Sequence, residues 1–585
     1  MNLLRKYQYA TYLIFVFLLF MLHQMYFIFI GGTTWDEYGS VMNASKQVYK
    51  LYLFLVDFNN PALIQELSPP EHYGGLLFIP ALLATFSESV MNIFSRLLSS
   101  FEQINTSNKI EVALIVRHIV LNFYIVSILA IFFNQLKKIY SKKFSLTFVV
   151  ILILIPSING HGLFNFTDIP FALQFFLASI IYLKFINVNT YNINIFIGFV
   201  FGLALLTRFN SIVFLASLSF FDLFLNLKNK QKYDFGNFYK PFFIKNITIY
   251  LTSFVVLFLG TPTGWKTPVK WIQGAYKYQF KQENETPTMF NGEVLYSHKT
   301  RADYLIDWLF VRTPIVIIVM LIVSIFLFGL VKQYRNIYNF FAVYFLFFVL
   351  ISFMLYRPVS YDGIRHYLFL FPFIVLLSTD ALFYFFEKKK LLLNVSIISI
   401  ILLLVYTQSG LGPYKYVYFN EFVEEDLITF ECEEVISQSG CGNWHTDYWG
   451  FGGKELYKIS KNYESKVLYF CVPHHVYSFY QENNNPWNFN RGNFEFDDQF
   501  PFTQQEYFYY NSDMLKHINS PEFKEIEFIS LNYHRPPLDS CGLTELDKNI
   551  FEIDCKVIDG VRANLRNKEI WMNYLYECSV EKLNT

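Results

Sequence analysis

Long apolar runs alternate with short polar segments over the first 410 residues, and this alternation then stops. A helix of about 20 apolar residues is long enough to cross the roughly 30 Å hydrocarbon layer of a membrane. The pattern predicts eleven spanning helices, at about 9–30, 112–134, 145–160, 169–187, 192–208, 211–227, 243–262, 306–330, 337–356, 366–387 and 391–409. Charged, Asn-rich and aromatic sequence follows, which is typical of a water-soluble region.

This pattern divides the chain into a transmembrane domain, residues 1–410, and an extracytoplasmic soluble domain, residues 411–585. Within the second domain a helix is expected at 452–463, and strands are expected at 466–472 and 524–533. The predicted fold class is therefore a polytopic α-helical membrane protein that carries a C-terminal soluble α/β domain.

Composition agrees with this class. Of the 585 residues, 54% are hydrophobic and 16% are charged, whereas about 25% of the residues in an average soluble protein are charged. The formal net charge is zero, so the total charge says nothing about partners. The sequence has no P-loop, dinucleotide-binding glycine motif, HExxH or CxxC pair, and no basic stripe for nucleic acid. Nucleotide, zinc and nucleic-acid chemistry therefore have no support.

Basic residues gather at one set of loops, which predicts that these loops are cytoplasmic. The clusters are Arg5/Lys6, 137–143, 228–232, Lys332/Arg335 and 388–390. Eleven spans fit them only if the segment 74–97, which contains Glu88 and Arg96, is an interfacial helix on the outer surface. The N-terminus is then inside, whereas the loops 32–111 and 263–305 and the soluble domain are outside.

The cysteines give the same orientation independently. All six lie in the soluble domain: Cys432, Cys441, Cys471, Cys541, Cys555 and Cys578. Disulfides persist in the periplasm or a secretory lumen, so at least one disulfide is expected, with buried free thiols as the alternative.

Acidic residues stand at the predicted outer ends of two spans. Asp36 and Glu37 follow the first span in "GGTTWDEYGS", and Asp168 precedes the fourth in "NGHGLFNFTDIPFA", a loop that also holds His161 and Asn165. Each acid also has a purely structural interpretation, as a helix cap near the membrane boundary. The long outer loop adds Glu71 and His72 in "SPPEHYGG".

Cations stand at the same predicted surface. Arg117 and Arg208 lie near the outer ends of their spans, and Arg357, Arg365 and His366 lie in "YRPVSYDGIRHYLF". Arginine at such an edge often only extends toward lipid headgroups. Several such edges together favour an anion site, because guanidinium groups bind phosphate through charge-assisted hydrogen bonds.

Outward carboxylates beside an outward phosphate site suit transfer of a group from a lipid-linked phosphate to a hydroxyl acceptor. A carboxylate removes the acceptor's proton and arginines stabilise the departing phosphate, so no nucleotide is needed. A transporter or lipid flippase and a non-enzymatic glycan-binding scaffold are the alternatives. The sequence lacks the internal repeats that many transporters have.

The motifs around these residues resemble a known family. The Asp-Glu pair after the first span, the "FNFTDIPFA" loop and the late "DGIRHYLFLFP" are similar to those of GT-C glycosyltransferases of the protein O-mannosyltransferase and lipid A aminoarabinose transferase type. The resemblance covers roughly residues 1–410, and 412–456 resembles the outward tail of bacterial members. Family members commonly have Lys or Pro-Lys before the second Asp, where this chain has Phe166-Thr167.

The resemblance implies an inverting transferase that uses a polyprenyl- or dolichyl-phosphate sugar. It implies that Asp36 is the general base, Glu37 its neighbour, and Asp168 a second acid that orients the acceptor or a metal. The donor-phosphate candidates are Arg117, Arg365 and His366, with Arg357 added from the same segment. The acceptor candidates are Glu71, His72, His161 and Asn165.

The resemblance requires no cofactor and is compatible with a divalent cation. The partners expected are a lipid-linked sugar donor, a protein, lipid or polysaccharide acceptor, and membrane lipids, with no nucleic acid. Because the tail resembles bacterial members, we expect a bacterial inner-membrane protein whose site and soluble domain face the periplasm.

Overall fold

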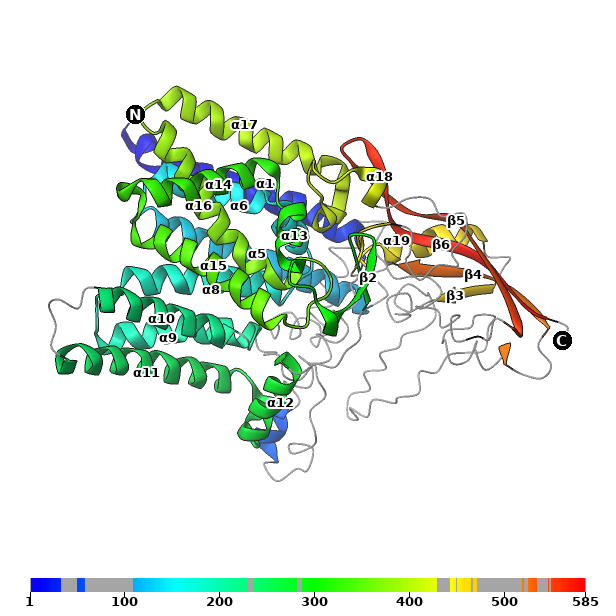
Figure 1. Ribbon diagram of the computed structural model, residues 1–585, viewed down its shortest axis with the longest axis horizontal. Coiled ribbons are helices and arrows are strands. Elements are labelled where there is room, and N and C mark those ends of the chain that lie inside the picture. Colours follow the sequence, from blue (N-terminus) through cyan, green and yellow to red (C-terminus); the bar gives the residue numbers. More distant parts are fainter. Residues whose placement is uncertain are drawn as a thin grey trace.

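A computed structural model describes residues 2–32, 50–57, 109–209, 211–228, 235–280, 287–428, 442–448, 450–463, 467–470, 518–519, 524–533, 546 and 549–583. Its helices form a bundle, and a small sheet from the C-terminal region lies beside one end of that bundle (Figure 1). The N-terminus lies at the other end (Figure 1).

Each apolar run contains a helix. The longer helices are α1 (Asn2–Ile30), α5 (Lys109–Leu136), α6 (Lys142–Leu154), α8 (Asp168–Lys184), α9 (Tyr191–Thr207), α10 (Ser211–Lys228), α11 (Phe235–Leu259), α14 (Ile315–Leu330), α15 (Ile337–Tyr356), α16 (Phe371–Phe386) and α17 (Lys390–Gln408). Among the described residues, six helices are long and apolar enough to cross a membrane, or seven if one bent pair counts as one span. This is the architecture of a membrane-embedded, mostly helical protein with several spans.

Two of the predicted continuous spans are broken at proline. In 306–330, α13 (Tyr304–Arg312) meets α14 at a bend of 118°, just before Pro314. In 145–160, α6 ends before Pro156, which begins the short helix α7 (Pro156–His161). Proline disfavours helical backbone in the residue before it and cannot donate to the preceding turn. The apolar pattern therefore located these segments but missed their breaks.

The described lysine-rich loops, 137–143 and 388–390, lie at the end of the bundle away from the sheet. Lys143, at the start of α6, donates to the side chain of Asn394 in the first turns of α17, at 2.5 Å. The helix α17 runs from this end toward the sheet (Figure 1), and α6 runs alongside it, because Gln408 at the end of α17 donates to the Leu154 carbonyl at the end of α6 at 2.8 Å. This arrangement agrees with the predicted topology, in which basic loops and soluble domain lie on opposite sides.

Among the described residues, the C-terminal sheet has four strands in the order β3-β4-β6-β5. They are β3 (Val467–Phe470), β4 (Glu525–Tyr533), β5 (Phe551–Leu565) and β6 (Lys568–Lys582), and only the β3–β4 pair is parallel. A helix, α19 (Gly453–Ser460), precedes β3. The helix predicted at 452–463 and the strand predicted at 524–533 are confirmed, and the strand predicted at 466–472 is confirmed over its described residues, Val467–Phe470.

A disulfide joins Cys555 to Cys578, which face each other across β5 and β6. The expectation of at least one disulfide is confirmed. Cys432, Cys441, Cys471 and Cys541 lie outside the described residues, as does the predicted interfacial helix 74–97.

Arg312, the last residue of α13, connects the bundle to the C-terminal region. Its buried guanidinium donates to the backbone oxygens of Tyr416, Tyr418 and His445 at 3.2, 3.0 and 2.9 Å. It also lies 3.8 Å from the ring centre of Phe419. The Arg312 side chain thus joins α13 to the 3₁₀ segment η9 (Ser409–Val417) and to the described residues that begin at 442.

The residues after that gap, 442–448 and 450–456, form what we call the tail segment. Its Asp447 is buried and accepts hydrogen bonds from the Tyr416 hydroxyl, from the backbone N–H groups of Phe451 and Gly452, and from the Asn573 amide on β6. The tail segment is therefore fastened to the bundle on one side and to the sheet on the other.

Candidate functional site

Asp168 is the first residue of α8, and its carboxylate is not the cap of that helix. Thr167 is the N-cap residue and makes no side-chain capping bond, while Asn165 Oδ1 accepts from the backbone N–H groups of Thr167 at 3.1 Å and Asp168 at 2.8 Å. The N-cap interpretation of Asp168 is thus wrong. Its carboxylate is directed to other partners.

The Asp168 carboxylate forms an ion pair with Arg208, the residue that ends α9. The Asn165 amide also donates to Asp168 Oδ2 at 2.9 Å. The side chains of Asp168 and Arg208 are only 3% and 11% exposed. Removal of either partner of such a buried pair would leave the other charge without compensation.

His161 lies on the other side of Asn165. Its Nδ1 is 3.3 Å from the Asn165 amide nitrogen, and its Nε2 is 2.8 Å from the hydroxyl oxygen of Tyr448 in the tail segment. Burial, together with the nearby cations Arg365 and Arg312, lowers the pKa of His161 well below its ordinary value. The imidazole is therefore neutral at physiological pH.

A second buried ion pair comes from the segment "YDGIR". Asp362 and Arg365 are 3.2 Å apart and are 8% and 4% exposed. Asp362 and Gly363 both have left-handed backbone, with φ of 57° and 67°, and the resulting turn leads into the 3₁₀ segment η8 (Arg365–Leu370). The Arg365 guanidinium also lies 4.9 Å from the ring centre of Tyr361, and the His366 ring meets the same tyrosine edge to face.

The two ion pairs converge on Tyr448. Burial raises the pKa of its hydroxyl, and Arg312, Asp362, Arg365 and Asp168 are all close enough to alter that pKa electrostatically. We call the convergent set the acid–arginine cluster. Its members are His161, Asn165, Asp168, Arg208, Asp362, Arg365 and Tyr448.

Arg117 reaches the same loop from α5. Its guanidinium lies 3.8 Å from the ring centre of Phe166, and the neighbouring His118 ring stacks on Phe166 at 5.9 Å. Arg117 and His118 are each 3% exposed. A buried cation therefore lies against the loop that presents Asp168.

Among the remaining candidates, Arg357 is described and is not brought into the cluster. Arg357 ends α15 in left-handed backbone, with φ of 43°, and its side chain is exposed. Within the described part of the chain, no ion pair or hydrogen bond joins it to the cluster. Asp36, Glu37, Glu71 and His72 lie outside the described residues.

The end of α1 nevertheless lies beside the cluster's loop. A Cβ at Gly31 would lie 2.3 Å from a ring atom of Phe451, so only glycine permits this approach. The Phe451 ring is in turn 4.8 Å from that of Phe164. Deeper in α1, Gln24 donates to the side chain of Asn159 on α7 at 3.2 Å. The first span therefore ends next to the 161–167 loop and the tail segment.

A further buried ion pair lies in the bundle, away from the cluster. Lys245 on α11 and Asp222 on α10 are 3.0 Å apart, and both are almost fully buried. Asp222 also accepts from the Tyr182 hydroxyl at 2.9 Å, and Lys245 donates to the Ile186 carbonyl at 2.8 Å. Each charge has local partners, so we interpret this pair as structural.

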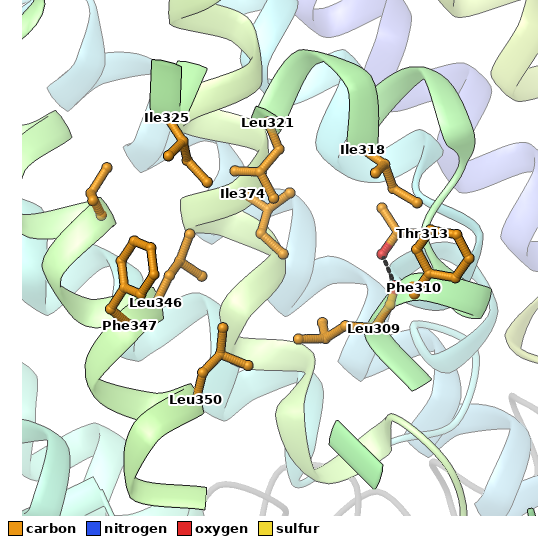
Figure 2. A pocket seen from close by; sticks show the side chains of 11 residues that line it. Leu309, Phe310, Thr313, Ile318, Leu321, Ile325, Leu346, Phe347, Leu350 and Ile374 are labelled. Atoms are coloured by element: carbon orange, nitrogen blue, oxygen red, sulfur yellow. Dashed lines mark hydrogen bonds between the residues drawn. The ribbon is translucent and has the colours of Figure 1, made fainter. Parts of the chain in front are cut away.

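An apolar cavity of about 150 Å³ lies between α13, α14, α15 and α16 (Figure 2). Figure 2 shows Leu346 and Phe347 on one side of it and Phe310 and Thr313 near the α13–α14 bend. The Thr313 hydroxyl is already bonded to the Leu309 carbonyl at 2.6 Å, so it presents little polarity to the cavity. Such a cavity suits hydrocarbon.

Sequence reasoning missed Arg312, Asp362 and Tyr448 as members of this region. Tyr448 and His161 are 287 residues apart, and no local pattern pairs them. Asp362 had a signal that was overlooked, because Asp-Gly is a typical turn pair.

Within the described residues, no three His, Cys, Asp or Glu side chains are grouped so that they could hold a metal ion. No protein-family model matches the chain, and no curated protein matches it. The function must therefore be inferred from the site itself.

Proposed function

We propose that this protein is a membrane glycosyltransferase of the GT-C type. It would move a sugar from a polyprenyl-phosphate donor to a hydroxyl acceptor on the non-cytoplasmic side, with inversion at the anomeric carbon. The observation that carries the proposal is the acid–arginine cluster, in which two buried acid–arginine pairs from distant segments converge at the bundle end that bears the sheet. Perturbed and buried ionisable groups gathered in this way favour a functional site.

In this mechanism Asp36 is the general base that takes the proton of the acceptor hydroxyl as it attacks the anomeric carbon. The bond between that carbon and the phosphate oxygen breaks, and the phosphate leaves with the electron pair. Arg365 and Arg117 stabilise the developing charge, with His366 as a further donor-phosphate ligand. Asp168, held by Arg208 and Asn165, orients the acceptor.

The position of Gly31 supports the role of Asp36. A fully extended chain advances at most about 3.6 Å per residue, so five residues after Gly31 reach no farther than about 18 Å. Gly31 packs against Phe451, which packs against the Phe164 ring of the cluster's loop. An acid following the first span is thus within reach of the cluster.

Arg117 supplies a positive charge at the place where this chain lacks the lysine that family members commonly have. Family members commonly have lysine just before the second acid, where this chain has Phe166-Thr167. Arg117 lies against the Phe166 ring and brings a positive charge to that loop from another helix. Glu71, His72 and His161 remain acceptor-side candidates in this proposal, with Glu37 beside the base.

The apolar cavity supports a lipid-linked donor. It begins at Thr313, beside Arg312, whose charge influences His161 and Tyr448. A hydrocarbon chain in the bundle and its phosphate at the bundle end would then occupy neighbouring regions. Membrane lipids are the other hydrocarbon partners expected there.

We further propose eleven spans in a bacterial inner membrane, with the cluster and the soluble domain in the periplasm. The separation of the lysine-rich loops from the cluster supports this orientation. The Cys555–Cys578 disulfide supports it as well, because disulfides persist in oxidising compartments.

Mass spectrometry of cell-envelope glycans and polyprenyl-linked sugars, with and without the protein, tests this function. Loss of the protein should remove one glycan modification and raise one sugar-charged lipid on the outer leaflet. The wild-type chain should restore both, and Asp168→Asn should not. Accumulation on the inner leaflet would instead favour a flippase, and unchanged glycans and lipids would contradict the proposal.

A further inference from the structure

The tail segment reaches the acid–arginine cluster through Tyr448. Its hydroxyl oxygen is 2.8 Å from His161 Nε2, and both side chains are almost completely buried. The preceding residue, Asp447, is held by Asn573 of the sheet at 2.9 Å and by the Gly452 backbone N–H at 2.7 Å. The C-terminal region therefore fixes the position from which Tyr448 contacts the cluster.

The orientation of the Asn165 amide follows from its partners. Its Oδ1 faces the backbone N–H groups of Thr167 and Asp168, which can only donate, so the oxygen must be on that side. The amide nitrogen then faces Asp168 Oδ2 at 2.9 Å and His161 Nδ1 at 3.3 Å. Its two protons serve one partner each.

This orientation determines the His161 tautomer. Because Asn165 donates to Nδ1, that nitrogen must be the acceptor of the neutral ring, and the ring proton must be on Nε2. The Nε2–H group then donates to the Tyr448 oxygen. A chain of hydrogen bonds thus runs from Tyr448 through His161 and Asn165 to Asp168.

We propose that Tyr448 is a positioning residue for Asp168, acting through His161 and Asn165. By accepting from Nε2–H it holds the imidazole in one tautomer and one orientation, and Asn165 in turn holds the carboxylate that faces Arg208. The inference rests on the proposed function in one respect, namely that Asp168 takes part in sugar transfer. It makes the tail segment a component of the transfer site rather than of a separate binding module.

The surroundings of His161 agree with a neutral ring. Burial is the main cause of its lowered pKa, and the two nearby cations add to it. The titratable and charged groups that face it come from several elements, namely Arg312 of α13, Arg365 and His366 of η8, Tyr416 of η9 and Tyr448 of the tail segment.

Nitrogen NMR of the whole protein, labelled with ¹⁵N-histidine and held in lipid nanodiscs, tests the chain without any substrate. The His161 signals are identified by their loss in His161→Gln. We expect a protonated Nε2 and an unprotonated Nδ1 at pH 7. Tyr448→Phe should shift the Nε2 signal, because phenylalanine cannot accept the hydrogen bond.

Tyr414→Phe is the matched control. It removes a hydroxyl that bonds Glu455 at 3.0 Å near the same segment, and it should leave the His161 signals unchanged. A ring protonated on Nδ1, a charged ring at pH 7, or identical Nε2 signals in wild type and Tyr448→Phe would overturn the inference. The wild-type measurement decides the tautomer even if Tyr448→Phe does not fold.

Turnover of a lipid-linked donor tests the positioning role. Tyr448→Phe should lower kcat with KM for the donor little changed, because misplacing a functional group by about 1 Å can cost about a hundredfold in rate. Added to His161→Gln, it should cause no further loss, because it acts through His161. A further independent loss would overturn the inference. An inactive wild-type protein would instead refute the proposed function, while the NMR result would stand.

Discussion

The ion pair between Asp168 and Arg208 ties the start of α8 to the end of α9, and both side chains are buried. The pair places one acid and one cation at the bundle end that faces the soluble region. The packing of α8 against α9 therefore depends on both charges of this pair being present.

Arg208→Met should therefore be strongly destabilising. It leaves the Asp168 carboxylate buried without its cation, which costs about 3–5 kcal/mol. Adding Asp168→Asn should recover part of that loss. Arg301→Gln is the control, because Arg301 pairs with Glu293 and Asp303 but is 43% exposed, and such pairs contribute about 1 kcal/mol or less. Equal losses for both arginines, measured by unfolding in detergent, would contradict the account of the buried pair.

Arg312→Gln should loosen the C-terminal region from the bundle. The guanidinium donates to three backbone oxygens, and hydrogen bonds from charged groups contribute about 1.5–3 kcal/mol each. Limited proteolysis should cleave the variant within the region after residue 410 much faster than the wild type. Arg562→Gln, which removes an exposed pair with Glu569, should not change the cleavage rate. Unchanged cleavage of Arg312→Gln would refute the anchoring role.

The Cys555–Cys578 disulfide should stabilise the sheet. It closes a loop with a sequence separation of 23, for which the expected stabilisation is about 3 kcal/mol. The double change Cys555→Ser and Cys578→Ser should lower the unfolding temperature of the C-terminal region and leave the helical bundle largely intact. A double variant as stable as the wild type would show that strand pairing alone suffices.

His161 should make the folded state sensitive to acid. Its pKa is lowered on folding, mainly by burial, so the stability due to the neutral ring is complete above the ordinary value of about 6.5. Below that pH the unfolded chain binds the extra proton, and up to about 1.4 kcal/mol is lost per pH unit. Unfolding temperatures at pH 7.5 and 5.5 should show this loss in the wild type and a smaller one in His161→Gln. The exposed His298 is the control, and His298→Gln should behave like the wild type.

The sequence predicted the positions of the helices but not the contacts between their side chains. The apolar pattern located the helices, because burial in lipid requires a long apolar run. It could not show that Thr167 rather than Asp168 is the N-cap residue of α8, since Thr and Asp are both suited to capping and the choice depends on the local backbone. Hydrophobic periodicity also cannot pair Asp168 with Arg208, because it predicts which face of a helix is buried and not which side chain that face contacts.

Arg357 and Arg365 make the same point within one motif. They were equivalent candidates, yet Arg357 is exposed at the end of α15 and Arg365 is buried against Asp362. The left-handed turn at Asp362 and Gly363 separates their environments. The Asp-Gly pair could have predicted the turn, but not which arginine it would bury.

The most direct measurement for the proposed transferase is single-turnover release of polyprenyl phosphate from a lipid-linked sugar by the purified protein, for wild type and Asp36→Asn. The asparagine keeps the size of the side chain and loses its basicity, so the rate should fall at least about a hundredfold. Donor affinity should change little, because the phosphate is bound by other residues. Near-normal release by Asp36→Asn would contradict the assignment of the general base and, with it, the mechanism proposed for this site.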